Sequence, residues 1–162
     1  MSDQIKSRLE EEIEKSSLSK DLQKRHMEFC HFLFDNEFFI ESEEDGNGWK
    51  IMFMSECIGH MNFANVGIWI DTCDFGSSAL ANDALKETAW AHVRSCEHFS
   101  SVGSQCGCGR QPGFSGLIFG KEYENLCFAR LEFMNPDTET LEDIKRMMLL
   151  FKRNKRDLKH AF

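Results

Sequence analysis

The chain has 162 residues, of which 41% are apolar and 28% are charged, and this ordinary globular composition excludes a disordered, collagen-like or membrane-spanning protein. A chain of this length buries about 70% of its extended surface when it folds as one domain, so we expect a single domain over residues 1–162. Its formal net charge of −8 repels nucleic acid and anionic membranes, and neither is an expected partner.

The beginning of the chain predicts two helices. Segment 1–17 contains a charged helix over residues 3–15, which we expect on the surface because its apolar residues recur only at every fourth position. These residues are Ile5, Leu9 and Ile13. Ser19 is a favoured N-cap residue, and the apolar spacing after it predicts a core-facing helix over residues 20–34.

From Glu37 onward the pattern changes to short aromatic and β-branched runs, which predict strands. Three such runs cover residues 37–41, 48–56 and 61–71. The sequence Asp45-Gly46-Asn47-Gly48 predicts a hairpin-like turn between the first two strands, and Gly59 is expected to break the chain between the second and the third.

Helical spacing returns over residues 79–97 and predicts a third helix. Residues 99–116 then hold five of the 11 glycines and form a loop that is costly to order unless something pins it. Two further strands are expected around the turn Gly120-Lys121: residues 114–119 and 123–133.

Residues 138–155 predict a long final helix with Asp137 or Thr138 as its N-cap. Its expected buried stripe is Leu141, Ile144, Met148 and Phe151. Its basic residues are expected in solvent, namely Lys145, Lys152, Arg153, Lys155 and Arg156. Met147, Leu149 and Leu150 widen the apolar surface, and we expect a second copy of the chain to cover the excess in a homodimer.

In chain order these elements read ααβββαββα. Helices and strands that alternate in this way predict an α+β fold with a mainly antiparallel sheet of about five strands packed against helices. We find no internal repeat and no linker.

The chain has seven cysteines, a number that would indicate disulfides only in an oxidising compartment. The first fifteen residues are rich in Glu and Lys and form no apolar signal-peptide core, so we expect a cytoplasmic protein with reduced thiols. Three cysteines lie singly among apolar neighbours and are expected in the core: Cys30, Cys57 and Cys73.

The remaining cysteines point to a metal site. Four nitrogen or sulfur donors, the number that a closed tetrahedral zinc site requires, lie within thirteen residues: Cys96, His98, Cys106 and Cys108. Cys127 and His92 are substitutes, because Cys127 lies on an expected strand and His92 lies one helical turn before Cys96. A sulfur-rich donor set predicts zinc.

Two other interpretations of these residues stay open. The thiols could be reduced cysteines in a mobile loop that binds no ion. They could also serve redox or nucleophilic chemistry, for which Cys106 and Cys108 are better placed because Arg110 is near. Cys96 is expected at a helix C-terminus beside Glu97, where the helix dipole and the carboxylate both oppose thiolate formation.

A group of motifs between residues 88 and 145 resembles the Cys-rich C-terminal signature of a family of small uncharacterised bacterial proteins. The matching residues are Trp90-Ala91-His92, Cys96, Cys106, Pro112-Gly113, Phe119-Gly120-Lys121-Glu122-Tyr123, Asn125-Leu126-Cys127 and Asn135-Pro136-Asp137. A cysteine often stands in this family where the chain has His98, and the replacement preserves a possible ligand. The family has no established activity, so the resemblance groups these residues and implies no reaction.

These features lead to two hypotheses of function. The first is a non-enzymatic ligand-binding or sensing domain with a metal-stabilised loop, because no local motif supplies a nucleophile, a base and an oxyanion group together. Its partner would be a small molecule or a protein, and its candidate ligand-binding residues are Trp49, Trp69, Trp90 and His92. The alternative is a small metal-assisted or thiol-dependent enzyme that uses the loop cysteines with His92 or His98 as base.

Overall fold

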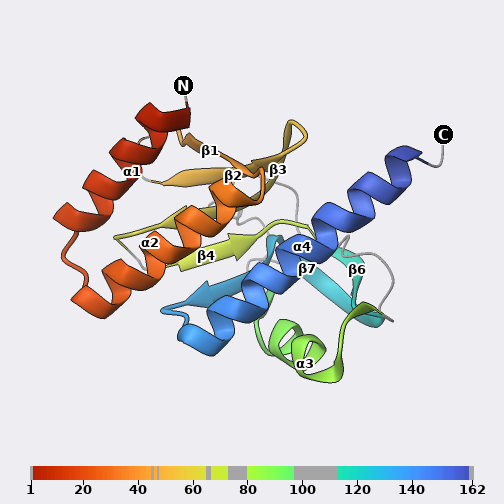
Figure 1. Cartoon of the computed structure of the whole chain (residues 1–162). Coiled ribbons are helices and arrows are strands. Elements are labelled where there is room, and N and C mark those ends of the chain that lie inside the picture. Colours follow the sequence, from red (N-terminus) through yellow and green to blue (C-terminus); the bar gives the residue numbers. More distant parts are fainter. Residues whose placement is uncertain are drawn as a thin grey trace. The chain divides into compact units, whose positions relative to one another are not determined.

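The computed structural model describes residues 2–44, 46, 48–64, 67–72, 80–96 and 113–160. These residues form four helices and a sheet of seven strands (Figure 1). The predicted α+β class is confirmed, and the strands pair antiparallel in every pair whose register is defined. The prediction of about five strands is wrong, because the strands Glu56–Asn62 and Val93–Ser95 have no separate signal in the sequence.

Contacts divide the chain into two compact units. The first comprises Met1–Ile68 and Phe133–Lys145, and the second comprises Trp69–Glu132 and Arg146–Phe162. Three elements have residues in both units, namely β4 (Gly67–Ile70), β7 (Lys121–Met134) and α4 (Thr138–His160).

Two amphipathic helices begin the first unit, α1 (Ser2–Lys15) and α2 (Lys20–Asp35). Both predicted helices are therefore confirmed. The predicted cap is also confirmed, because the Ser19 hydroxyl oxygen accepts a hydrogen bond from the Leu22 backbone N–H at 3.4 Å. The apolar stripes of the two helices are fully buried at Leu9, Ile13, Phe29 and Leu33.

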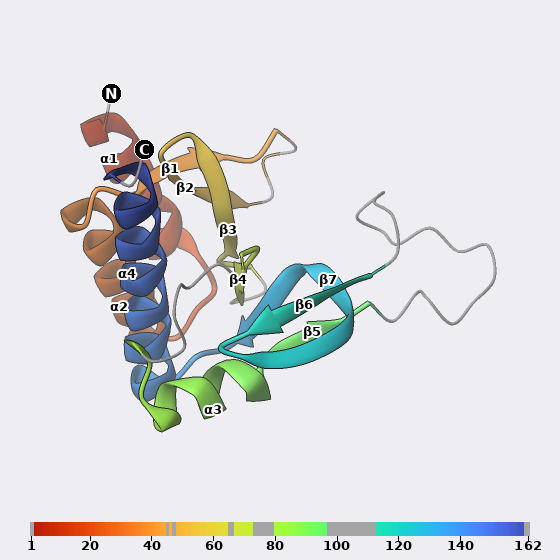
Figure 2. The same cartoon turned by 90° about the vertical axis from the view of Figure 1, so that its right-hand side faces the viewer.

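Three antiparallel strands follow in the same unit, β1 (Phe39–Ser42), β2 (Trp49–Phe53) and β3 (Glu56–Asn62). One face of these strands is buried and carries Ile40, Trp49, Ile51, Phe53, Ile58 and Met61. Figure 2 shows α1 and α2 on one side of the three strands, so the buried face is the one that packs on the helices. Within the described part of this unit, the opposite face carries no helix.

The predicted strands over 48–56 and 61–71 are wrong in their boundaries. The chain turns at Met54 and Ser55, which adopt positive φ angles of 50° and 66°, and Gly59 lies buried inside β3. Residues other than glycine seldom take positive φ, so this turn has no signal in the sequence.

The second unit contains α3 (Asp83–Ala91), β5 (Val93–Ser95), β6 (Phe114–Ile118) and most of β7. β6 and β7 form the predicted hairpin, and its turn uses the positive φ angles of Phe119 and Gly120, 48° and 82°. In the whole sheet the strand order is β1-β2-β3-β4-β7-β5, with β6 paired to β7.

The predicted helix over 79–97 is too long at both ends. Its N-cap is Asn82, whose side-chain oxygen accepts from the Leu85 N–H at 2.9 Å, and residues beyond Ala91 leave the helix to form β5. Leu80, which lies inside the predicted range, precedes the helix and is 44% exposed.

The buried stripe predicted for α4 is confirmed, since its four residues are at most 3% exposed: Leu141, Ile144, Met148 and Phe151. The Asp137 carboxylate caps the helix by accepting from the Thr140 N–H at 2.8 Å. Lys145 was expected in solvent, but its side chain is only 15% exposed because the ammonium group lies over the Phe32 ring at 5.7 Å. No helix in the described part of the chain is long and apolar enough to cross a bilayer.

Candidate metal centre

A β-bulge brings Cys57 and His60 to the same face of β3. Successive residues of a strand point to opposite faces, so residues three apart would normally diverge. The pairing of β2 with β3 shifts between Ile51 and Met52, because Ile51 faces Gly59 whereas Met52 faces Cys57. The extra residue in β3 turns both side chains outward, away from the buried neighbours Ile58 and Met61.

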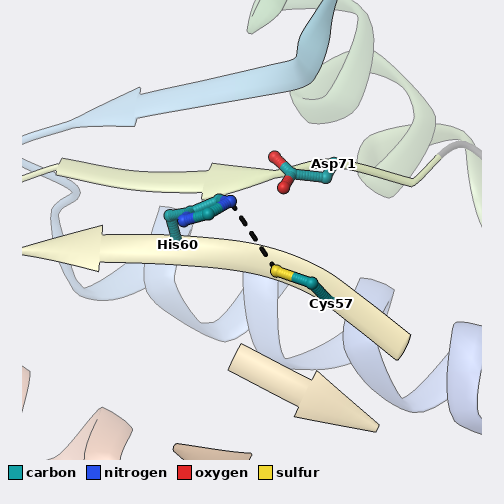
Figure 3. A group of neighbouring side chains, drawn as sticks. All are labelled: Cys57, His60 and Asp71. Carbon is teal, nitrogen blue, oxygen red and sulfur yellow. Dashed lines mark hydrogen bonds between the residues drawn. The ribbon is translucent and has the colours of Figure 1, made fainter. Parts of the chain in front are cut away.

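The two side chains point toward one another in Figure 3. The distance from Cys57 Sγ to His60 Nε2 is 3.7 Å, and both residues are half-buried. The Cys57 thiol also lies 3.5 Å from the Gly59 carbonyl oxygen, to which it can donate.

Glu43 fixes the orientation of the His60 ring. Its Oε1 lies 2.5 Å from His60 Nδ1. An ionised carboxylate only accepts hydrogen bonds, so Nδ1 carries the proton and the lone pair of Nε2 is directed toward Cys57 Sγ. Glu43, His60 and Cys57 form a hydrogen-bonded row that lies wholly within the first unit.

The turn before β2 holds Glu43 in this position. The Glu43 N–H donates to the Gly48 carbonyl oxygen at 2.8 Å, which closes the chain after β1. A Cβ on Gly48 would stand 3.2 Å from Glu43 Cδ and 3.3 Å from its Oε2, so the glycine leaves room for the carboxylate.

Asp71 is a buried acidic residue of the second unit. It directly follows β4 and is 5% exposed. Its backbone carbonyl accepts from the Arg130 guanidinium group.

The structure describes only part of the sulfur-rich set predicted from the sequence. Cys96 and Cys127 are buried at 9% and 7% exposure, and the Cys96 N–H donates to the Asn125 carbonyl oxygen at 2.6 Å. Because Cys127 is two residues from Asn125, the pairing of this segment with β7 brings the two cysteines to diagonally adjacent positions. His98, Cys106 and Cys108 lie outside the described residues, as does Cys73.

The four predicted ligand-binding residues occupy different places. Trp49 is buried in the first unit, where its indole N–H donates to Glu12 at 3.1 Å. In the second unit Glu132 makes hydrogen bonds with both Trp69 and His92. Its carboxylate accepts from the Trp69 indole N–H at 2.8 Å, and its backbone N–H donates to the His92 carbonyl oxygen at 2.9 Å. The Trp90 indole donates to the Ile118 carbonyl oxygen at 2.7 Å.

Sequence reasoning placed Cys57 in the core and did not consider His60. The signal present in the sequence is a Cys-x-x-His spacing, which favours a shared ligand only if the local backbone puts both residues on one face. On a regular strand two residues three apart point to opposite faces. The bulge that brings Cys57 and His60 to one face depends on the pairing of β3 with β2.

No family model matches the chain, and no curated protein or solved structure is significantly similar to it. The family resemblance of residues 88–145 therefore stays a prediction.

Proposed function

We propose that the protein is a non-enzymatic metal-binding domain in which Cys57 and His60 hold a zinc ion. The observation that carries the proposal is the separation of 3.7 Å between Cys57 Sγ and His60 Nε2. Zinc bonds of about 2.3 Å to sulfur and about 2.0–2.1 Å to nitrogen, set at a tetrahedral angle, place these two atoms about 3.6 Å apart. The donors are thus spaced to bind an ion with little movement.

The Glu43 contact supports the same function. Histidines that bind metals usually donate their second ring N–H to a carboxylate, which fixes the tautomer and makes the ligating nitrogen more basic. Glu43 makes this contact at 2.5 Å on the side of the ring that faces away from Cys57. It would therefore act as a positioning residue and not as a ligand.

The chemistry of the donors favours zinc over other common ions. Thiolate and imidazole are poor ligands for magnesium and calcium, which prefer oxygen. Cysteine sulfur and histidine nitrogen are the usual ligands of zinc in proteins, and its structural sites are almost always tetrahedral.

The test is the metal content of the full chain purified without a metal-affinity tag. We expect about one zinc ion per chain at this centre, and loss of that ion in Cys57→Ser and His60→Asn. Glu43→Gln should keep the ion but lower its affinity about 10- to 100-fold in a chelator competition.

His31→Asn is the matched control, because His31 also contacts a glutamate, Glu10, at 3.0 Å but lies far along the chain on α2. This variant should bind zinc like the unaltered protein. Equal metal content in Cys57→Ser, His60→Asn and the control would show that the ion, if any, is held elsewhere.

The sulfur-rich set of the sequence prediction is retained as a second proposed zinc site, with ligands Cys96, His98, Cys106, Cys108 or Cys127. It is supported by the neighbouring positions of Cys96 and Cys127 across the pairing with β7. Metal that stays bound in a Cys57→Ser/His60→Asn double variant, and is lost on further Cys96→Ser substitution, would identify this site.

A further inference from the structure

We infer that Cys57 is a nucleophilic thiol that forms a mixed disulfide with small organic disulfides, and that His60 is the base that takes its proton. The reaction uses the two side chains of the proposed zinc centre in the metal-free protein, and it does not require that the protein binds zinc. It therefore goes beyond the proposed function and gives the pair a chemical activity of its own.

The order of three side chains is the first support. A thiol nucleophile is activated when a neighbouring base accepts its proton and a third group orients that base. His60 Nε2 lies 3.7 Å from Cys57 Sγ (Figure 3). Glu43 lies 2.5 Å from Nδ1 and keeps the proton there, so Nε2 is the accepting atom. The nucleophile, the base and the orienting carboxylate all belong to the first unit.

The surface beside the thiol is the second support. Cys57 is half-buried, its register partner on β2 is Met52, and the partner of Met52 on β1 is Phe39. Residues that face one another across a ladder point to the same side of the sheet, so these three side chains form a row that ends at the sulfur. Phe39 is 62% exposed. A disulfide with aromatic substituents can therefore pack on this row while its sulfur atoms meet Cys57.

Cys30 is a thiol of the same unit that lacks these features. It lies on α2 and is 1% exposed. Burial raises the pKa of its thiol to about 12, and Glu10 and Glu12 add to the effect. Such a thiol does not ionise near neutral pH and does not meet a dissolved reagent. Cys30 is therefore an internal reference for an inert cysteine.

The reaction balances with the small disulfide as the oxidant. The Cys57 proton moves to His60 Nε2 while Sγ attacks one sulfur of the reagent, so that a new sulfur–sulfur bond forms and the bond within the reagent breaks. The departing thiolate takes the proton from His60 and leaves as a thiol. Cys57 is thereby oxidised and the reagent is reduced. A sulfur held in a mixed disulfide is no longer a thiolate, so under the proposed function modification and zinc binding exclude one another.

The experiment treats the full chain, freed of metal by a chelator, with dipyridyl disulfide at neutral pH. Mass spectrometry of the peptides gives the initial rate at each cysteine, in the folded chain and in the chain unfolded by urea. A few per cent of an ordinary thiol is already ionised at neutral pH, and a more acidic thiol is a weaker nucleophile, so the expected gain for Cys57 on folding is about fivefold. Cys30 should react only in the unfolded chain.

His60→Asn and His60→Gln should each remove the fivefold gain, whereas His31→Asn should keep it. Protection of Cys30 in every variant shows that the first unit still folds. Nitrogen NMR should place the proton of the neutral His60 ring on Nδ1. A folded Cys57 that reacts no faster than the unfolded one, equal rates with and without His60, or a neutral ring with its proton on Nε2 would overturn the inference.

A zinc arm separates this inference from the proposed function. One equivalent of zinc should protect Cys57 from the disulfide. A fast, His60-dependent reaction that zinc does not slow would overturn the zinc centre and leave the nucleophilic thiol in place. Protection by zinc of a Cys57 whose reaction does not depend on His60 would overturn the nucleophilic thiol alone.

Discussion

His26 illustrates how burial sets the charge of a single side chain. The residue is 3% exposed on α2, its Nδ1 donates to the Leu22 carbonyl oxygen at 2.9 Å, and its ring meets the Phe63 ring edge-on at 5.5 Å. Burial lowers the pKa of His26, the Leu22 hydrogen bond partly opposes this, and Arg25 adds to the lowering. The folded protein therefore holds a neutral imidazole at this position.

We predict that this histidine makes the fold less stable as the pH falls below about 6.5, the ordinary pKa of histidine in an unfolded chain. Above that pH His26 is neutral in both states and adds no pH dependence. Below it the unfolded chain binds a proton that the folded chain resists, so the free energy of unfolding falls until the pH reaches the lower, folded pKa.

NMR titration of the His26 ring measures the folded pKa directly, and urea unfolding across this pH range measures the loss of stability. His26→Gln should flatten the pH dependence, whereas His31→Asn on the same helix should not. A folded pKa at or above the ordinary value would refute the prediction.

At the scale of elements, α3 shows how a cap decides where a helix begins. The helix has nine residues, and short helices depend on their ends because nucleation is costly. Asn82 accepts from the Leu85 N–H at 2.9 Å, which satisfies one of the free donors of the first turn.

We predict that Asn82→Ala lowers the free energy of unfolding by about 1 kcal/mol, the usual cost of losing such a cap. Chemical denaturation followed by circular dichroism measures this value. Asn82→Asp keeps an acceptor at the same place and should cost much less. Equal losses in the two variants would show that the hydrogen bond does not account for the start of the helix.

The turns of the sheet show which local structures are readable in the sequence. Gly120 marks the hairpin between β6 and β7, because glycine takes a positive φ without strain, and that hairpin was predicted. Met54 and Ser55 take positive φ as well, but only the pairing of β2 with β3 holds them there. The helices were also predicted from local signals, namely the N-cap residue Ser19 and the apolar spacing of α4.

At the scale of the whole molecule, the candidate site follows from long-range pairing more than from local motifs. Cys96 and Cys127 were identified because cysteine and histidine cluster in the sequence. Cys57 and His60 lie on one face only because β3 pairs with β2 through a bulge. Their spacing of three residues would put them on opposite faces of a regular strand, so the sequence alone could not reveal the pair.

The predicted homodimer depends on apolar residues of α4 that the chain itself leaves exposed. Of the three residues expected to lie between two copies of α4, Met147 is fully buried within the chain, whereas Leu149 is 40% exposed. The homodimer stays a prediction that now depends on Leu149 and Leu150. Light scattering across the micromolar range should give a dimer mass that Leu149→Glu reduces to that of a monomer. A monomer mass for the unaltered chain at every concentration would rule the dimer out.

The bulge in β3 also has an evolutionary consequence. Deletion of the extra residue would leave the cysteine and the histidine two positions apart on a regular strand, which again places both side chains on one face. A relative with a Cys-x-His spacing and no bulge would therefore present the same pair of side chains, whereas a relative that keeps the Cys-x-x-His spacing on a regular strand would not. Comparison by sequence spacing alone would assign the pair wrongly in both cases.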